Sequence, residues 1–176
     1  MLCFSQEQFD KSGFMGGSNV ITLKKIEPSD KSKFWNIVQK YLYEMTNYYD
    51  MGVMDELGNY QYRYFDSYFE DSERSALFIY DDGALVGFAM VNDYSCLGNH
   101  IDHAIAEFTI FPHHRKRHLG VKSVQKIFEQ HHGRWEIKYS SKNKAAEALW
   151  MRVTKKYNPL ISTYGRDESV LSFVVT

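Results

Sequence analysis

The residues best suited to chemistry in this chain form one basic turn, Arg115-Lys116-Arg117-His118-Leu119-Gly120. Before it, residues 104–110 read as a strand that ends ahead of Pro112, because proline cannot donate to a sheet ladder. After it, apolar residues recur on one face of a predicted helix: Val121, Val124, Ile127 and Phe128. Backbone N–H groups at a helix start, surrounded by arginine and lysine, attract an anion such as a phosphate. The turn therefore predicts an anion site between a strand and a helix.

The strand before the turn contributes one acidic side chain, Glu107. Strict alternation assigns its residues to two faces, because successive side chains of a strand point to opposite sides. One face is expected to carry Ala104, Ala106, Phe108 and Ile110, and the other Ile105, Glu107 and Thr109. Glu107 would then lie on the strand that leads into the anion site.

The elements that must position this turn follow from periodicity and from turn residues. Pro28-Ser29-Asp30 marks a helix start, and Asp81-Asp82-Gly83 is typical of a tight hairpin. We expect helices near residues 34–45, 64–70, 121–128 and 146–157, and a loop or broken helix over 47–63. We expect strands over residues 20–26, 75–80, 84–91, 104–110, 134–139, 160–164 and 169–175. The strand–helix–strand crossing in the second half requires one parallel pair in an otherwise antiparallel sheet.

Composition bounds the class of protein. The 176 residues are 44% hydrophobic and 24% charged, as in a globular domain, and the net charge of −1 argues against a nucleic-acid-binding domain. Two cysteines indicate no disulfide framework and fit a reducing compartment. No apolar run approaches the roughly 20 residues of a membrane span, and residues 1–19 lack the pattern of a secretory signal. We expect a cytoplasmic protein with a loosely held extension over 1–19 and a single domain over 20–176.

The turn and a second motif together resemble the GNAT superfamily of acetyl-CoA-dependent N-acetyltransferases. That family's phosphate-binding turn reads Arg/Gln-x-x-Gly-x-Gly/Ala, and Arg115 and Gly120 match its first and last positions. The second signature is an Asn, an Ala three residues later and an aromatic residue four further on. Here it stands as Asn143, Ala146 and Trp150. The resemblance implies an α/β (α+β) fold with a mixed, mostly antiparallel sheet of about seven strands, flanked by helices, with a splayed parallel pair at its centre.

The resemblance also implies which residues bind acetyl-CoA as cosubstrate. Amides from Arg117 to Val121 would hold the pyrophosphate, with added charge from arginine and lysine side chains. The pantetheine arm would pair with backbone groups of residues 108–110, opposite Asn143. The implied cofactor-binding residues are Phe108, Thr109, Ile110, Arg115, Lys116, Arg117, His118, Leu119, Gly120, Val121, Asn143, Ala146 and Trp150. His118 departs from the family, since it replaces the first glycine of the turn, and we expect it to adopt an ordinary helical φ.

Acetyl transfer from a thioester to an amine requires three chemical roles. A base must take the amine proton, because a lysine-type ammonium has a pKa of about 10.4. Glu107 is the candidate base, with a strand-edge ion pair to Arg or Lys as the alternative. The backbone N–H near Ile110 is the candidate donor to the oxyanion. The family often uses a tyrosine in its last helix to protonate the thiolate; Trp150 stands there, and Tyr157 is expected to lie too far along the helix.

The remaining motifs narrow the partners without identifying the acceptor. The clustered histidines, His113, His114 and His118, lack the spacing of metal ligands, so no metal is expected. Acids and tyrosines over residues 41–68 favour either a cationic amine or a solvated acidic loop; the acids are Glu44, Asp50, Asp55, Glu56 and Asp66. The alternative function is a non-catalytic acyl-CoA-binding sensor or interaction domain of the same fold. The oligomeric state stays open, with a homodimer among the options, and neither nucleic acid nor membrane is an expected partner.

Overall fold

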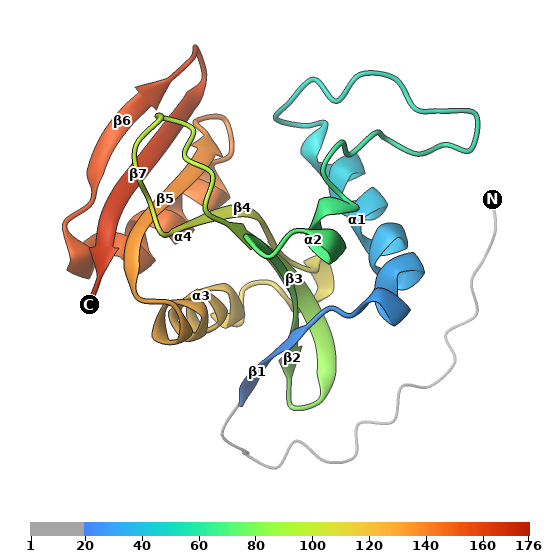
Figure 1. Ribbon diagram of the computed structural model, residues 1–176, viewed down its shortest axis with the longest axis horizontal. Coiled ribbons are helices and arrows are strands. Elements are labelled where there is room, and N and C mark those ends of the chain that lie inside the picture. Colours follow the sequence, from blue (N-terminus) through green and yellow to red (C-terminus); the bar gives the residue numbers. More distant parts are fainter. Residues whose placement is uncertain (1–19) are drawn as a thin grey trace.

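A computed structural model describes residues 20–176 of the protein (Figure 1). The predicted extension over 1–19 lies outside the described residues. The described chain forms a seven-stranded sheet in the order β1-β2-β3-β4-β5-β7-β6. The strands are β1 (Ile21–Lys25), β2 (Arg74–Asp81), β3 (Ala84–Asn92), β4 (His103–Ile110), β5 (Gly133–Ser140), β6 (Leu160–Tyr164) and β7 (Glu168–Val175). The helices are α1 (Lys31–Met45), α2 (Ser67–Glu70), α3 (Leu119–Gln130) and α4 (Lys144–Thr154), with 3₁₀ turns at Pro28–Asp30, Pro112–His114 and Lys155–Tyr157.

The predicted mixed sheet is confirmed. Neighbouring strands are antiparallel throughout residues 20–176 except for β4 and β5, which run parallel because α3 connects them. The hairpin between β2 and β3 is also as predicted. Asp82 and Gly83 have φ values of 48° and 83°, and two consecutive positive φ angles are the signature of a tight two-residue hairpin turn.

The two faces of the sheet are covered by different helices, which lie apart in Figure 1. On one face α1 buries Phe34, Val38 and Leu42 within an aromatic cluster that includes Phe78 and Phe88. On the other face α3 and α4 pack against the sheet, and their buried apolar residues are Leu119, Val124, Ile127, Phe128, Trp150 and Val153. Fully burying each large apolar side chain contributes roughly 1.5–3 kcal/mol. The apolar helix faces predicted from the sequence are therefore the faces that pack against the sheet.

The parallel pair opens into a gap. β4 and β5 are paired only where His103–Ile105 lie beside Trp135–Ile137. Beyond this point β4 stays with β3 and β5 stays with β7, so the two strands diverge. The backbone edge of β4 from residue 106 to 110 is thereby left without a strand partner on the β5 side.

The predicted side-chain alternation along β4 is wrong. Ile105 pairs with Val91 and Glu107 pairs with Met90, so Ala106 stands opposite no residue of β3 and forms a bulge. The extra residue inverts the alternation, so Ile105 joins Phe108 and Ile110 on the face covered by α3 and α4. Glu107 and Thr109 face the α1 side. The bulge therefore leaves Glu107 on the α1 side of the sheet, while Ile105, at the start of the strand, packs into the core on the side of α3 and α4.

No helix within residues 20–176 combines the length and the apolar character needed to cross a membrane.

Candidate active site

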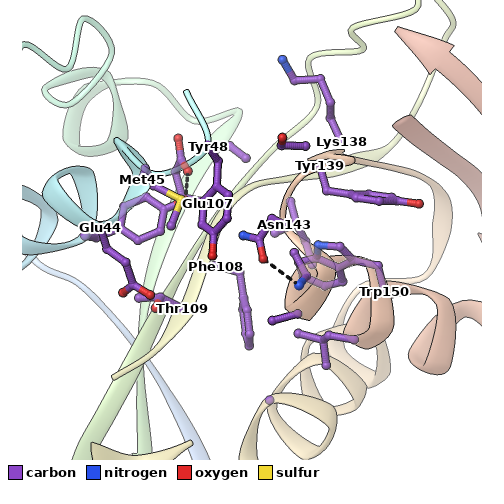
Figure 2. A pocket seen from close by; sticks show the side chains of 18 of the residues that line it. Glu44, Met45, Tyr48, Glu107, Phe108, Thr109, Lys138, Tyr139, Asn143 and Trp150 are labelled. Atoms are coloured by element: carbon purple, nitrogen blue, oxygen red, sulfur yellow. Dashed lines mark hydrogen bonds between the residues drawn. The ribbon is translucent and has the colours of Figure 1, made fainter. Parts of the chain in front are cut away.

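A cavity of about 890 Å³ occupies the gap between β4 and β5 (Figure 2). Its lining comes from α1 and the loop after it, from β4 and the basic turn, and from β5, α4 and Glu168 of β7. It reaches every predicted cofactor-binding residue except Arg117, which is not part of the lining. The structure therefore brings residues of the two sequence motifs, 115–120 and 143–150, into the lining of one cavity.

The basic turn forms a concave arrangement of backbone groups. Lys116 and His118 both have left-handed backbone conformations, with φ values of 63° and 60°, and α3 begins directly after His118. The expectation of an ordinary helical φ for His118 is wrong, because the chain must reverse here to enter the helix. Turns that contain left-handed residues direct successive N–H groups toward a common point, which suits an anion. The same geometry explains why glycine is the usual residue at the position of His118.

The two arginines of the turn are engaged within the protein. Arg115 forms a bidentate ion pair with Glu44 of α1, at 2.6 and 2.7 Å, and its Nε donates to the Ile110 carbonyl at 2.7 Å. Arg117 donates to the buried Asp81 carboxylate at 3.2 Å. The hydrogen bonds that Arg115 donates to the Glu44 carboxylate raise the pKa of Arg115. Both arginines hold the turn in place, while Lys116 lines the cavity without an ion pair among the described residues.

The open edge of β4 has two accessible backbone positions, not the three expected. The Phe111 N–H donates to the Val86 carbonyl at 2.8 Å, and hydrogen-bonded pairs alternate along antiparallel strands. The register then commits the backbone of Thr109 to Phe88 in β3, whereas the N–H groups of Phe108 and Ile110 point toward the gap. Because the Ile110 carbonyl accepts from Arg115, Ile110 offers only its N–H to the cavity, beside the backbone groups of Phe108.

The opposite wall is set by the start of α4. Asn143 caps the helix, because its Oδ1 accepts from the Ala146 N–H at 3.0 Å. Its side-chain nitrogen points into the gap toward Tyr48 (Figure 2). Trp150 is only 5% exposed and its ring lies 5.5 Å from that of Phe108, so it forms an apolar wall. Tyr157 instead stacks on Phe173 at 5.6 Å, away from the cavity.

Glu107 is held by two phenols. The Tyr41 hydroxyl donates to its Oε2 at 2.5 Å and the Tyr62 hydroxyl donates to its Oε1 at 3.1 Å. Within the described residues its partners are therefore tyrosines, and the expected alternative of an ion pair with arginine or lysine is absent. Burial raises the pKa of Glu107, while the two hydrogen bonds oppose that rise. The pKa of Tyr41 and of Tyr62 is also raised, chiefly by burial, so both phenols stay protonated.

Sequence reasoning did not identify Tyr41 and Tyr62 as partners of Glu107, although both lie in the tyrosine-rich region over residues 41–68. Tyr41 lies on the inner face of α1, where the helical period placed it in the core, and Tyr62 comes from a loop without periodicity.

The acids over residues 41–68 mostly have partners outside the cavity: Asp55 accepts from its own loop and Asp66 pairs with Lys31. Of the five acids named there, only Glu44 and Asp50 line the cavity.

A third tyrosine stands out in the close view. Figure 2 shows the Tyr48 hydroxyl pointing into the space between Phe108 and Asn143, whereas the Tyr139 hydroxyl points away from it. Tyr48 follows the end of α1, where its N–H donates to the Met45 carbonyl at 2.9 Å. It places a phenol between the open strand edge and the start of α4.

Together these features define a class of protein: a mixed sheet that splits at a parallel strand pair, with a partly buried carboxylate on the first strand of the pair and an anion-binding turn after that strand. The family model "Acetyltransferase (GNAT) family" matches residues 36–154. The chain belongs to this family. No curated protein matches the sequence.

Solved structures of the same fold are numerous, and they are distant in sequence. An acetyltransferase from Thermus thermophilus is 12% identical with a TM-score of 0.62, over 88% of this chain and 96% of that chain. The aminoglycoside acetyltransferase AAC(6')-Ib, solved in complex with coenzyme A, is 13% identical with a TM-score of 0.64, over 88% and 95%. NAA60 from Arabidopsis thaliana, in complex with acetyl-CoA, is 14% identical with a TM-score of 0.53, over 88% and 97%. At these identities the likeness shows the fold.

Proposed function

We propose that this protein is an N-acetyltransferase that moves the acetyl group of acetyl-CoA directly to a primary amine of a small molecule or peptide. The observation that carries the proposal is the position of Glu107. Two tyrosines hold this partly buried carboxylate at the gap between β4 and β5, one residue from Phe108 and three from Ile110 along the same strand. A base and an oxyanion donor on one rigid strand are what direct acyl transfer requires.

The cavity has the groups needed to hold acetyl-CoA. The amides from residues 117 to 121, at the positive end of α3, suit a pyrophosphate, and Lys116 adds charge. The backbone of Phe108 and Ile110 is open for pairing with the amides of a pantetheine arm. The side-chain nitrogen of Asn143 can donate to the same arm, and Trp150 supplies an apolar wall.

The bound ammonium gives one proton to Glu107, and the resulting amine nitrogen forms a bond to the thioester carbon while the carbon–sulfur bond breaks. The nitrogen then releases a second proton, which balances the proton that the thiolate takes up. The Ile110 N–H donates to the carbonyl oxygen as negative charge develops there. This donor is preorganised, because the Thr109 carbonyl of the same peptide group is committed to β3 and Arg115 fixes the next carbonyl.

The thiolate that leaves needs a proton. Trp150 cannot supply it, because the indole N–H is not an acid near neutral pH. Tyr48 is the phenol that points between Phe108 and Asn143 (Figure 2), and we assign it this role within the proposal.

Thiol release tests the proposal. The full chain is mixed with acetyl-CoA and a panel of primary amines, and free thiol is followed against an amine-free background. We expect at least one amine to raise the rate well above background and to appear as its N-acetyl product by mass. If acetyl-CoA binds tightly and no amine raises turnover, the sensor alternative replaces this proposal. If acetyl-CoA does not bind, both are wrong.

A further inference from the structure

The part of the cavity on the α1 side of the sheet, where the acceptor amine would bind next to Glu107, is lined by carboxylates of the sheet. Residues paired across neighbouring strands share a face, and Ser140 pairs with Glu168 while Lys138 pairs with Val170. Because the side chains alternate, Glu136, Lys138 and Glu168 all project from the face that also carries Glu107. These residues line the cavity together.

The negative charge on this face exceeds the positive charge. Lys138 is already paired with Glu168, at 3.0 Å. Glu107 is bound by phenols, and Glu136, 2% exposed, accepts only from neutral donors of the loop that joins β3 to β4. Those donors are the Ser95 hydroxyl at 2.9 Å, the Cys96 N–H at 3.1 Å and thiol at 3.6 Å, and the Asn99 amide at 3.4 Å. In residues 20–176, neither Glu107 nor Glu136 has a cationic partner within ion-pair distance.

Aromatic rings complete this part of the cavity. Tyr41, Tyr49 and Tyr62 come from α1 and the loops after it, and Met51 adds an apolar surface. The pKa of Tyr49 rises to about 12, chiefly through burial and then through the charges of Glu168 and Glu107. Ring faces and carboxylates together attract an organic cation and accommodate an apolar stem. A second anionic group on the ligand would have no free cation to meet among the residues that line this part of the cavity in the described chain.

We infer that the acceptor is a primary ammonium on an apolar stem that carries no carboxylate beside the amine. This inference rests on the proposed function and narrows its substrate class to alkylamines and arylalkylamines. Free amino acids are excluded, since their carboxylate would enter a region whose lysine is already neutralised by Glu168. A like charge placed at such a site is repelled, because no free cation in this region offsets it.

Three probes of matched shape test this inference: phenethylamine, phenylalaninamide and phenylalanine. The amide carries the bulk of a carboxylate without its charge, so it separates repulsion from steric exclusion. After correction for the fraction of free amine, we expect kcat/KM for the first two to agree within about tenfold and that for phenylalanine to be at least about 100-fold lower. Equal values for the amide and the acid would overturn the inference while leaving the proposed function intact.

One variant should change the selectivity in a defined direction. Glu168→Gln releases Lys138, so we expect kcat/KM for phenylalanine to rise about tenfold relative to phenethylamine. Glu147→Gln is the matched control, because it breaks an exposed ion pair with Lys144 on α4 and should leave the ratio unchanged. An unchanged ratio in Glu168→Gln would contradict the role of this carboxylate. Absence of turnover with every amine, the amide included, would overturn the proposed function and this inference with it.

Discussion

The cavity is built from backbone on one side and from side chains on the other. Toward α3 it is lined by the open edge of β4 and by the amides of the basic turn, which belong to one continuous stretch from residue 108 to 121. Toward α1 it is lined by Tyr41, Tyr62 and Glu107 and by acids of β5 and β7, which lie far apart in the chain. Under the proposed function this difference corresponds to a division of roles: the first side would hold acetyl-CoA, and the second would hold the acceptor amine and take its proton.

One ion pair connects the two sides. Arg115 belongs to the turn, yet its guanidinium reaches Glu44 of α1 and also supports the end of β4. A bidentate pair of this kind fixes geometry better than a single contact does. The ion pair therefore fixes the position of the turn relative to α1.

The largest expected effect comes from removing the proposed base, Glu107. Glu107→Gln should lower kcat/KM about 10²–10⁴-fold at neutral pH, the usual contribution of a general base. The rate should recover partly at high pH, where the amine loses its proton unaided. Thiol release across pH measures this. Unchanged rates at every pH would exclude Glu107 as the base.

One added methyl group on β3 should displace β4 and so disrupt the backbone-built side of the cavity. A Cβ on Gly87 of β3 would lie 2.2 Å from the Thr109 carbonyl oxygen, so Gly87→Ala must push β4 away. We expect a loss of about 1–3 kcal/mol in the free energy of unfolding, measured in urea. Gly120→Ala is the control, because its Cβ would make an ordinary contact with Leu149 at 3.5 Å. If the two variants lose the same free energy of unfolding, the close approach of β3 and β4 is not the cause of the loss.

On the side-chain side, the phenols should tune the base. Tyr41→Phe or Tyr62→Phe removes a hydrogen bond that favours the carboxylate, so the pKa of Glu107 should rise further. The base must be charged to act, and the acid limb of the kcat/KM profile should therefore move to higher pH by about one unit. Tyr157→Phe, outside the cavity, should leave the profile in place. A shift to lower pH in either cavity variant would contradict this arrangement.

The smallest effect is expected in the turn itself. His118→Gly removes a side chain from a left-handed backbone position and should stabilise the fold by up to about 1 kcal/mol. Urea denaturation measures the gain, and the KM for acetyl-CoA should not increase. Asn158→Gly, at φ 50°, should change stability less, because asparagine tolerates this conformation. A His118→Gly variant that binds acetyl-CoA more weakly would show that the imidazole itself contacts the cofactor.

The two sides also differ in how far the sequence predicts them. Residues 104–130 and 143–150 carry local signals, namely periodicity, proline, a basic turn and a helix cap, so the strand, the helix and the parallel pair could be predicted. The bulge at Ala106 could not, because it depends on how β4 pairs with β3. His118 was misjudged for a related reason, since its φ follows from the direction in which the chain enters α3.

The acceptor side depends on contacts between distant residues. Tyr62 meets Glu107 across 45 positions of sequence, and Ser95 meets Glu136 across 41. No local pattern encodes such pairs, and an acidic loop in the sequence gives no sign of whether its acids face the cavity. Glu44 illustrates this, because the sequence leaves open whether it binds a cationic amine or lies in a solvated loop, and in the structure it pairs with Arg115 of the same chain.

A titration of acetyl-CoA into the wild-type protein and into Glu107→Gln, by calorimetry, tests the division of roles most directly. We predict Kd values that agree within about threefold, alongside the loss of about 10²–10⁴-fold in turnover. In the proposed arrangement acetyl-CoA contacts the backbone-built side, which this change does not alter. A Kd for acetyl-CoA that weakens in proportion to the turnover would contradict the account.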